Sequence, residues 1–139
     1  PELAKRVVAV IEALMNRGIE VRVVQGLRTY AEQDALYAQG RTKPGKRVTN
    51  ARGGYSNHNF GLAVDLCPFK DGEPQWDDDA AFNAIGQEAK RQALEWGGDW
   101  TKLVDKPHIQ LHGLTVAQCR AAYGRGGLKE VWKEIDRLL

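Results

Sequence analysis

The segment Ser56-Asn57-His58-Asn59-Phe60-Gly61-Leu62-Ala63-Val64-Asp65 carries the strongest signal in the chain, together with Asp105-Lys106-Pro107-His108 downstream. These segments supply two imidazoles and a carboxylate, and Asp105 adds a carboxylate three residues before the second histidine. Two imidazoles and one carboxylate around an open fourth position form the ligand set of a catalytic zinc site, because the open position holds the water to be activated. Asp105 is then a candidate general base.

The spacing of the possible ligands fits a loop that runs into a strand. His58 and Asp65 are seven residues apart, too far to share one helical turn, and His108 would come from a neighbouring strand. A histidine near an aspartate is also common without a metal, so composition and spacing alone leave a structural histidine as the alternative. Gly61 and Ala63 favour the metal site, because small residues let backbone or substrate approach closely.

Hydrophobic periodicity predicts short strands interspersed with helices. Helical spacing covers residues 3–14, alternation over 19–23 predicts a strand, and Thr29 with Glu32 forms a capping-box pair that opens a helix to about residue 40. The other predicted features are a long loop at 41–57, a strand at 62–67, a turn-rich segment at 68–77, a helix capped by Asp78 or Asp79, a strand at 109–111, a helix opened by Thr115 and Gln118 that ends near residue 124, and an amphipathic helix at 128–138. Short strands and long loops favour an α+β fold.

Bulk properties fit one globular domain spanning residues 1–139, with 42% hydrophobic and 27% charged residues. A net charge of +2 is too small to indicate nucleic acid, and no apolar run approaches the roughly 20 residues of a membrane span. The chain begins with Pro1, so a removed signal peptide stays an open alternative. Cys67 and Cys119 form at most one pair, and two free thiols are the preferred interpretation.

Four motifs together resemble a known family, the zinc M15 peptidases, which comprise D-alanyl-D-alanine carboxypeptidases and L-alanyl-D-glutamate endopeptidases. Ser56-x-His58-x-x-Gly61-x-Ala63-x-Asp65 matches the family signature SxHxxGxAxD, and Asp105-x-x-His108 is similar to its second signature. The other two are Gly26-Leu27-Arg28-Thr29 with Gln33 and Leu36-Tyr37, which looks like the N-terminal arginine segment, and Glu95-Trp96-Gly97-Gly98-Asp99-Trp100, which resembles a run of the endopeptidase branch. The resemblance covers roughly residues 19–112.

The resemblance implies a role for each matched residue. One zinc ion per chain would be bound by His58, Asp65 and His108, with Asp105 as the base and Arg28 facing the reacting carbonyl. An aspartate base, where the carboxypeptidase branch often has glutamate, favours the endopeptidase branch. The substrate-binding candidates are Ser56, Arg52, Gln33, Trp96 and Asp99.

Several of these candidates have a structural alternative. Arg28 is otherwise a surface arginine at a helix start, Trp96 a core residue and Asp99 a turn cap. Ser56 would position its loop or bind substrate, and Gln110 either orients a ligand or is an ordinary polar strand residue. The basic loop, whose cations are Arg41, Lys43, Lys46, Arg47 and Arg52, is by default solvated and mobile; the alternative is contact with an acidic stem peptide or an anionic wall polymer.

We therefore expect an α+β domain with a small, mainly antiparallel sheet that carries zinc and is flanked by helices. The resemblance implies the fold that the M15 peptidases share with the hedgehog signalling domain. The implied function is hydrolysis of the L-alanyl-D-glutamate bond of peptidoglycan stem peptides. D-alanyl-D-alanine carboxypeptidase activity is the alternative, and a catalytically silent zinc-bearing binding module is a second one. We expect a monomer that acts in the cell wall, the periplasm or outside the cell, without nucleic acid or a membrane span as a partner.

Overall fold

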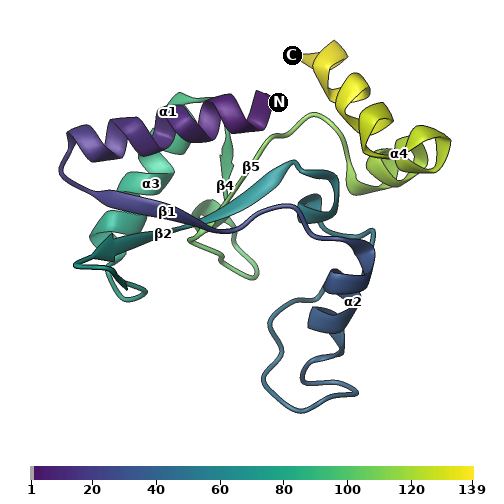
Figure 1. Cartoon of the computed structure of the whole chain (residues 1–139), viewed down its shortest axis with the longest axis horizontal. Coiled ribbons are helices and arrows are strands. Elements are labelled where there is room, and N and C mark those ends of the chain that lie inside the picture. Colours follow the sequence, from purple (N-terminus) through teal and green to yellow (C-terminus); the bar gives the residue numbers. More distant parts are fainter. Residues whose placement is uncertain (1) are drawn as a thin grey trace. The chain divides into compact units, whose positions relative to one another are not determined.

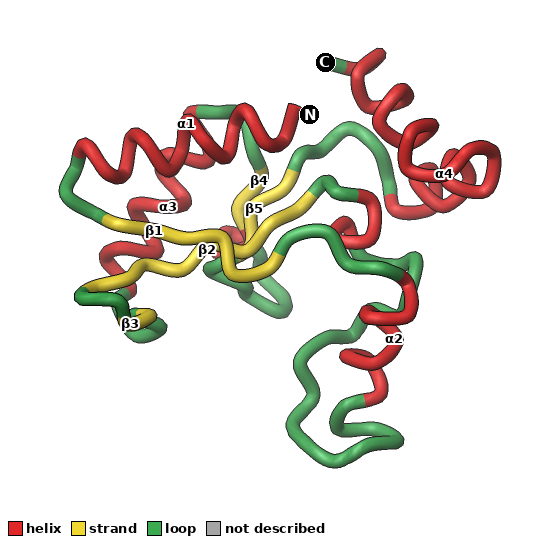
Figure 2. The backbone as a smooth tube through the Cα atoms, in the orientation of Figure 1, coloured by secondary structure: helices red, strands yellow, loops and turns green. Residues whose placement is uncertain are grey.

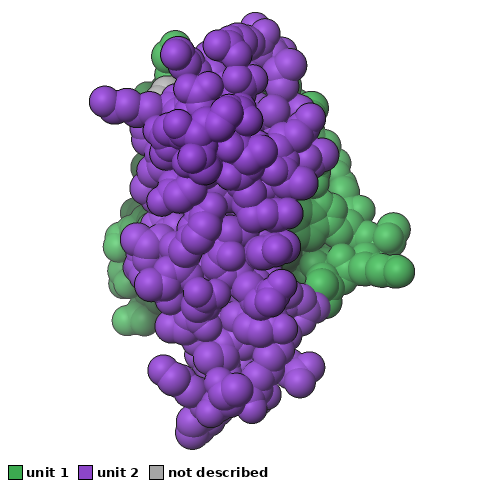
Figure 3. All heavy atoms as spheres, turned by 90° about the vertical axis from the view of Figure 1, so that its right-hand side faces the viewer, with its two compact units in different colours: residues 1–26, 63–112 green, residues 27–62, 113–139 purple. Residues whose placement is uncertain are grey.

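The computed structural model describes residues 2–139, and its elements follow the predicted order closely (Figures 1 and 2). Along the chain they are α1 (Glu2–Asn16), β1 (Glu20–Gln25), α2 (Tyr30–Ala38), the 3-10 helix η1 (Asn57–Phe60), β2 (Ala63–Lys70), β3 (Glu73–Pro74), α3 (Asp79–Arg91), β4 (Glu95–Trp96), the 3-10 helix η2 (Gly97–Asp99), β5 (His108–Gln110) and α4 (Val116–Leu138). They form two compact units, one from residues up to 26 and 63–112, the other from residues 27–62 and 113–139 (Figure 3).

The first unit is an antiparallel sheet with two helices. The strands lie in the order β1-β2-β5-β4, and β3 pairs with β2. α1 and α3 pack against each other and against the sheet, as Figure 1 shows. The core of this unit includes the side chains of Leu3, Val7, Val10, Leu14, Val21, Leu66, Cys67, Phe82, Ile85, Leu94 and Ile109. Helices beside a small antiparallel sheet confirm the predicted α+β class.

A buried carboxylate ties the two helices of this unit together. Glu88 of α3 is 4% exposed and accepts hydrogen bonds from Arg17, which follows α1, at 3.0 Å and from Arg91 at 3.1 Å. A carboxylate this buried requires cationic partners, because burial without them would remove its hydration at a large cost in free energy. The three side chains therefore fix the C-terminal end of α1 against α3.

The second unit holds the long loop, η1 and the helices α2 and α4. An aromatic cluster forms its centre, with the rings of Tyr30 and Tyr123 stacked at 4.9 Å and Phe60 edge-on to Tyr30 at 6.0 Å. The indole N–H of Trp132 in α4 donates to the carbonyl oxygen of Phe60 at 2.8 Å. α4 thereby covers η1, which carries one of the predicted ligands.

The loop at 41–57 is tied down by one of its own cations, and the default prediction of a freely solvated basic loop is wrong for Arg41. Its guanidinium donates to the carbonyl oxygens of Tyr37 at 2.7 Å and Thr49 at 3.0 Å, and lies 3.9 Å from the centre of the Tyr37 ring. A planar guanidinium can make all these contacts at once. Lys43, Lys46 and Arg52 remain exposed.

Both predicted capping boxes are confirmed, at Thr29–Glu32 and Thr115–Gln118. The turn-rich prediction for residues 68–77 is wrong at its start, where β2 continues through Pro68 to Lys70 and turns back into β3. Proline removes only one N–H donor from the hydrogen bonds between the strands and otherwise fits an extended backbone.

The helix predicted to end near residue 124 and the helix predicted at 128–138 are confirmed as the two segments of α4. α4 extends to Leu138 across a kink at Gly126 and Gly127. These two glycines separate the segments that the sequence predicts as two helices.

Candidate metal centre

Asp65 and His108 are direct cross-strand neighbours. β2 and β5 pair with Asp65 opposite His108 and Ala63 opposite Gln110. Side chains of opposed residues project from the same face of a sheet, so the strand register alone brings this carboxylate and this imidazole together. Nδ1 of His108 lies 3.4 Å from Oδ1 of Asp65.

His58 is held by the short helix η1. The Ser56 hydroxyl caps this helix by accepting the His58 backbone N–H at 3.2 Å, and Oδ1 of Asn59 accepts the Ser56 N–H at 3.3 Å. Gly61 closes the helix with φ of 69°, a left-handed conformation that glycine adopts without strain. The chain then enters β2 two residues later.

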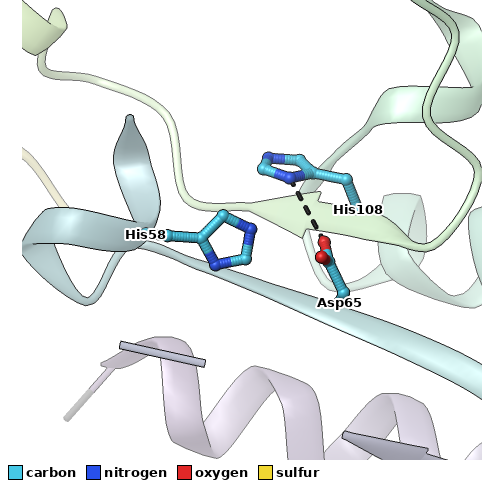
Figure 4. Close-up of side chains that lie close together, drawn as sticks. All are labelled: His58, Asp65 and His108. Atoms are coloured by element: carbon cyan, nitrogen blue, oxygen red, sulfur yellow. Dashed lines mark ion pairs between the residues drawn. The ribbon is translucent and has the colours of Figure 1, made fainter. Parts of the chain in front are cut away.

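The three predicted ligands come together as one group. Figure 4 shows the side chains of His58, Asp65 and His108 close together. Each offers a ligand atom, and these atoms lie within 4.8 Å of one another. Both histidines are buried, and Asp65 is half-buried. Two ligands each about 2 Å from one ion lie at most about 4 Å apart, so the separations in this group are close to those around a single cation. Two imidazoles and a carboxylate with no thiolate suit zinc.

The surroundings of His108 favour the charged form of its imidazole more than water does. Burial lowers the pKa of its imidazole, but hydrogen bonds to Asp65 and Gln110 and the charges of Asp65 and Asp105 outweigh burial and raise that pKa above 6.5. Two carboxylates facing an imidazole create a negative environment, which a cation would relieve. The same charges that hold a proton on His108 would thus favour a metal ion in its place.

Asp105, the predicted base, lies beside this group. Its Oδ2 is 3.9 Å from Nδ1 of His108, and its side chain is 44% exposed. The Asp105 backbone N–H donates to the carbonyl oxygen of Gly97 at 2.9 Å, and a Cβ at Gly97 would lie only 2.2 Å from the Asp105 carbonyl oxygen. Only glycine permits this approach, and it fixes the backbone that presents the carboxylate.

Trp96 supports the same segment. Its side chain is 8% exposed, and its indole N–H donates to the carbonyl oxygen of Lys106 at 2.7 Å. A Cβ at Gly86 or Gly98 would fall within 2.4 Å of the Trp96 ring. This burial favours the core alternative over the predicted contact with substrate.

Arg28 is fixed by side chains of its own unit. Its guanidinium donates to Oε1 of Gln33 at 3.1 Å, and its backbone N–H donates to the carbonyl oxygen of His58 at 2.9 Å. Gln33 is fully buried and donates in turn to the carbonyl oxygen of Ala51 at 2.9 Å. Its burial favours a role in positioning Arg28 over the direct substrate contact predicted for it.

The remaining predicted contacts lie at exposed or half-buried positions. The Arg52 guanidinium stands 5.0 Å from the centre of the Tyr55 ring, and Asp99 forms an exposed ion pair with Lys90 at 2.9 Å. Ser56 uses its hydroxyl for the helix cap described above. Whether any of the three binds substrate stays a prediction.

Two further polar residues contact the segments of this site, and the sequence marks only the second of them. Asn59 is 3% exposed and bonds to both loops that carry Arg28 and Ser56, yet nothing in its local pattern marks it. Gln110 lies 2.6 Å from Nε2 of His108. Its position two residues along the same strand was a usable signal, because alternate strand residues share one face.

The chain is similar to known proteins in both sequence and fold. A profile of the M15 peptidase family described as D-alanyl-D-alanine carboxypeptidase matches residues 49–111. The peptidoglycan L-alanyl-D-glutamate endopeptidase CwlK of Bacillus subtilis (strain 168) is 45% identical over 108 residues, which cover 71% of this chain and 65% of that protein. This chain therefore spans somewhat less than two thirds of that relative.

Solved structures share the fold. The L-Ala D-Glu endopeptidase ChiX of Serratia marcescens is 28% identical, with a TM-score of 0.53 over 76% of this chain and 77% of that one. The vancomycin-resistance D,D-pentapeptidase VanY, solved as an E175A mutant with Zn(II), is 16% identical with a TM-score of 0.59, over 94% of this chain and 81% of that one, and so bears on the fold alone. The α+β fold with its His/Asp/His group is that of a candidate metal-binding domain. In sequence, the chain is similar to the M15 peptidase family.

Proposed function

We propose that this chain is a zinc-dependent peptidoglycan peptidase that hydrolyses the L-alanyl-D-glutamate bond of stem peptides. The observation that carries the proposal is the group of His58, Asp65 and His108, whose ligand atoms lie within 4.8 Å of one another, with the Asp105 carboxylate 3.9 Å from His108. The choice of bond is supported by the similarity of the chain to CwlK and ChiX, both of which are L-alanyl-D-glutamate endopeptidases.

In this proposal one zinc ion per chain is held by His58, Asp65 and His108. Zinc bound there would polarise the scissile carbonyl and supply an activated water near neutral pH. The donor set supports zinc over magnesium or calcium, since those ions prefer sites made of oxygen ligands alone.

Asp105 would act as the general base. Its half-exposed carboxylate can accept a proton from the attacking water and return it to the leaving amine. Its backbone is fixed by Gly97 and its neighbour Lys106 by the Trp96 indole, so the carboxylate is presented from a rigid segment. Such preorganisation is needed because small displacements of a base cost much of its rate advantage.

Arg28 would stabilise the oxyanion of the tetrahedral intermediate. A fixed cation at a developing negative charge is worth several kcal/mol in such reactions, about 3 to 4 for a single hydrogen-bond donor. The buried amide of Gln33 supports this role because it holds the guanidinium in one orientation. In the proposal, Gln33 thus acts through Arg28.

D-alanyl-D-alanine carboxypeptidase activity is the second candidate, and the description of the matching family profile favours it. The aspartate at position 105 and the Trp96-to-Trp100 run instead favour the endopeptidase. A silent binding module has no need of a base and an oxyanion partner, and the presence of both Asp105 and Arg28 argues against it.

We further propose that the chain acts as one catalytic domain and as a monomer on stem peptides in the cell wall or periplasm or outside the cell. Within residues 2–139, none of the helices combines the length and apolarity that a bilayer crossing requires. A net charge of +2 supports no nucleic-acid partner.

The proposed chemistry can be tested by separating metal binding from turnover. Asp105→Asn should retain one zinc per chain but lose at least 100-fold in the rate of new amino groups released from purified peptidoglycan, since the amide cannot accept the proton. The matched control is Asp77→Asn, an exposed aspartate before α3, which should behave as the wild type. Full hydrolysis by the Asp105 variant would remove Asp105 as the base.

A further inference from the structure

His108 has different neighbours on its two ring nitrogens. Nδ1 lies toward the carboxylates of Asp65 and Asp105, at 3.4 and 3.9 Å, whereas Nε2 lies 2.6 Å from Oε1 of Gln110. The ring is therefore oriented, with one nitrogen toward the proposed metal ligand Asp65 and the other toward the sheet.

The sheet register assembles a row of polar side chains behind that ring. Gln110 is paired with Ala63 of β2 on one side and with Glu95 of β4 on the other. Opposed residues share one face of a sheet, so Gln110 and Glu95 stand next to each other and next to His108. Ala63 is buried and small, which leaves the Gln110 side chain room to lie beside the imidazole.

The groups in this row have fixed hydrogen-bonding polarity. The indole N–H of Trp100, which can only donate, bonds to Oε2 of Glu95 at 2.8 Å, and the ionised Glu95 can only accept. Nε2 of Gln110 lies 3.2 Å from the same oxygen, and only the NH₂ end of an amide can donate there. The Gln110 carbonyl must then face His108, where it can only accept, so the proton of a neutral His108 lies on Nε2.

Trp100 also constrains the ring directly. Its centroid lies 5.0 Å from that of His108, with the planes tilted by 49°. One side chain thus packs against the imidazole and anchors the carboxylate at the far end of the row. All four residues belong to the same compact unit.

We propose that Gln110 is a positioning residue for the reaction and that, with Glu95 and Trp100, it locks His108 in the Nε2-protonated tautomer so that Nδ1 presents its lone pair to the metal. The proposal rests on the proposed function in one respect, namely that His108 is a metal ligand. Hydrogen bonds behind a metal-binding histidine commonly change metal affinity 10- to 100-fold, because they fix both the tautomer and the orientation of the ring.

The first test determines the tautomer of the His108 imidazole in the wild-type protein. Long-range ¹H–¹⁵N correlation spectra of the imidazoles, with His108 assigned by His108→Gln, should show a protonated Nε2 and an unprotonated Nδ1 at a pH where the ring is neutral. With zinc added, Nε2 should keep its proton. A neutral ring with its proton on Nδ1 and none on Nε2 would overturn the proposal without recourse to any further variant.

The second test uses a rescue. Gln110→Leu removes the acceptor and should weaken zinc binding 10- to 100-fold in competition with a chromophoric chelator. The exchange variant E95Q/Q110E keeps an acceptor beside Nε2 of His108 and keeps every hydrogen bond of the row. Only the bond between positions 95 and 110 reverses, since the amide at position 95 accepts from Trp100 and donates to the carboxylate at position 110. It should recover most of the lost affinity.

The control for Gln110→Leu is Gln87→Leu, an exposed position of α3 that should leave the affinity unchanged. Wild-type affinity in Gln110→Leu, or an exchange variant no better than Gln110→Leu, would contradict the proposal. Failure of the proposed function is distinguishable, because zinc binding unaffected by His58→Ala would show that the ion binds elsewhere. If the wild-type protein binds zinc and hydrolyses peptidoglycan, and Gln110→Leu binds zinc with the same affinity, only the positioning role of Gln110 is refuted.

Discussion

At the scale of single residues, the site depends on side chains that make no contact with the reaction. Asn59 accepts the N–H groups of Gly54 and Ser56 and donates to the carbonyl oxygens of Arg28 and Thr29, at 3.1 to 3.3 Å. It joins the loop before η1 to the start of α2. One buried amide thus fixes the backbone of the segments that carry a proposed ligand and the proposed oxyanion partner.

Replacing this amide should be costly. Asn59→Leu would leave buried backbone groups without hydrogen bonds, so the free energy of unfolding should fall by about 2 to 4 kcal/mol, at about 1 to 3 kcal/mol for each group left unsatisfied. Urea denaturation followed by circular dichroism measures this change. Asn83→Leu, at an exposed position of α3, is the control, and an equally small loss in both variants would contradict the account.

Cys119 gives a second prediction at this scale. The thiol is fully buried, and burial raises its pKa to about 11. A raised pKa means that the folded protein retains this proton while the unfolded chain loses it, so this contribution to stability is present below pH 9 and declines between pH 9 and about 11.

The pKa of Cys67 is also raised by burial. At pH 8, alkylation of both thiols should be slow in the native protein and rapid in denaturant, as mass spectrometry would show. Rapid modification of the native protein would contradict the burial of these side chains.

At the scale of elements, local sequence signals were sufficient wherever a side chain interacts with its own backbone. The capping boxes at Thr29 and Thr115 and the cap at Asp78 could be predicted because each is complete within four residues. The strand register, the continuation of β2 through Pro68 and the row behind His108 could not, because they depend on pairing between segments distant in sequence. The ligands themselves were predictable through a family resemblance and not through spacing.

The kink in α4 provides a matched pair of glycine substitutions. Gly127 has φ of 72° and ψ of −160°, a conformation nearly restricted to glycine, whereas Gly124 lies in the helix, where an added Cβ would have open space for 4 Å around it. Gly127→Ala should therefore destabilise the protein by roughly 1 to 3 kcal/mol. Gly124→Ala should instead stabilise it by about 0.5 to 1 kcal/mol. Thermal denaturation measures the stability of both variants. Equal changes in melting temperature would contradict a kink at Gly127.

At the scale of the whole molecule, the proposed metal ties stability to function. An ion that binds only the folded chain adds stability by mass action, about 4 kcal/mol when its free concentration is 1,000 times the dissociation constant. Zinc should therefore raise the melting temperature of the metal-free protein, and a chelator should reverse the increase. His58→Ala should abolish the shift, so an equal shift in that variant would place the ion elsewhere.

The identity of the bond that is cut separates the proposed endopeptidase from its alternatives, and mass spectrometry of defined muropeptides digested by the zinc-loaded protein identifies that bond. Chelated protein and Asp105→Asn serve as controls without activity. We expect release of a peptide that begins at D-glutamate, in the zinc-loaded wild type alone. Loss of a single terminal D-alanine would contradict the endopeptidase assignment in favour of the carboxypeptidase, and no cleavage by the fully metallated protein would contradict a peptidase of either kind acting on these substrates.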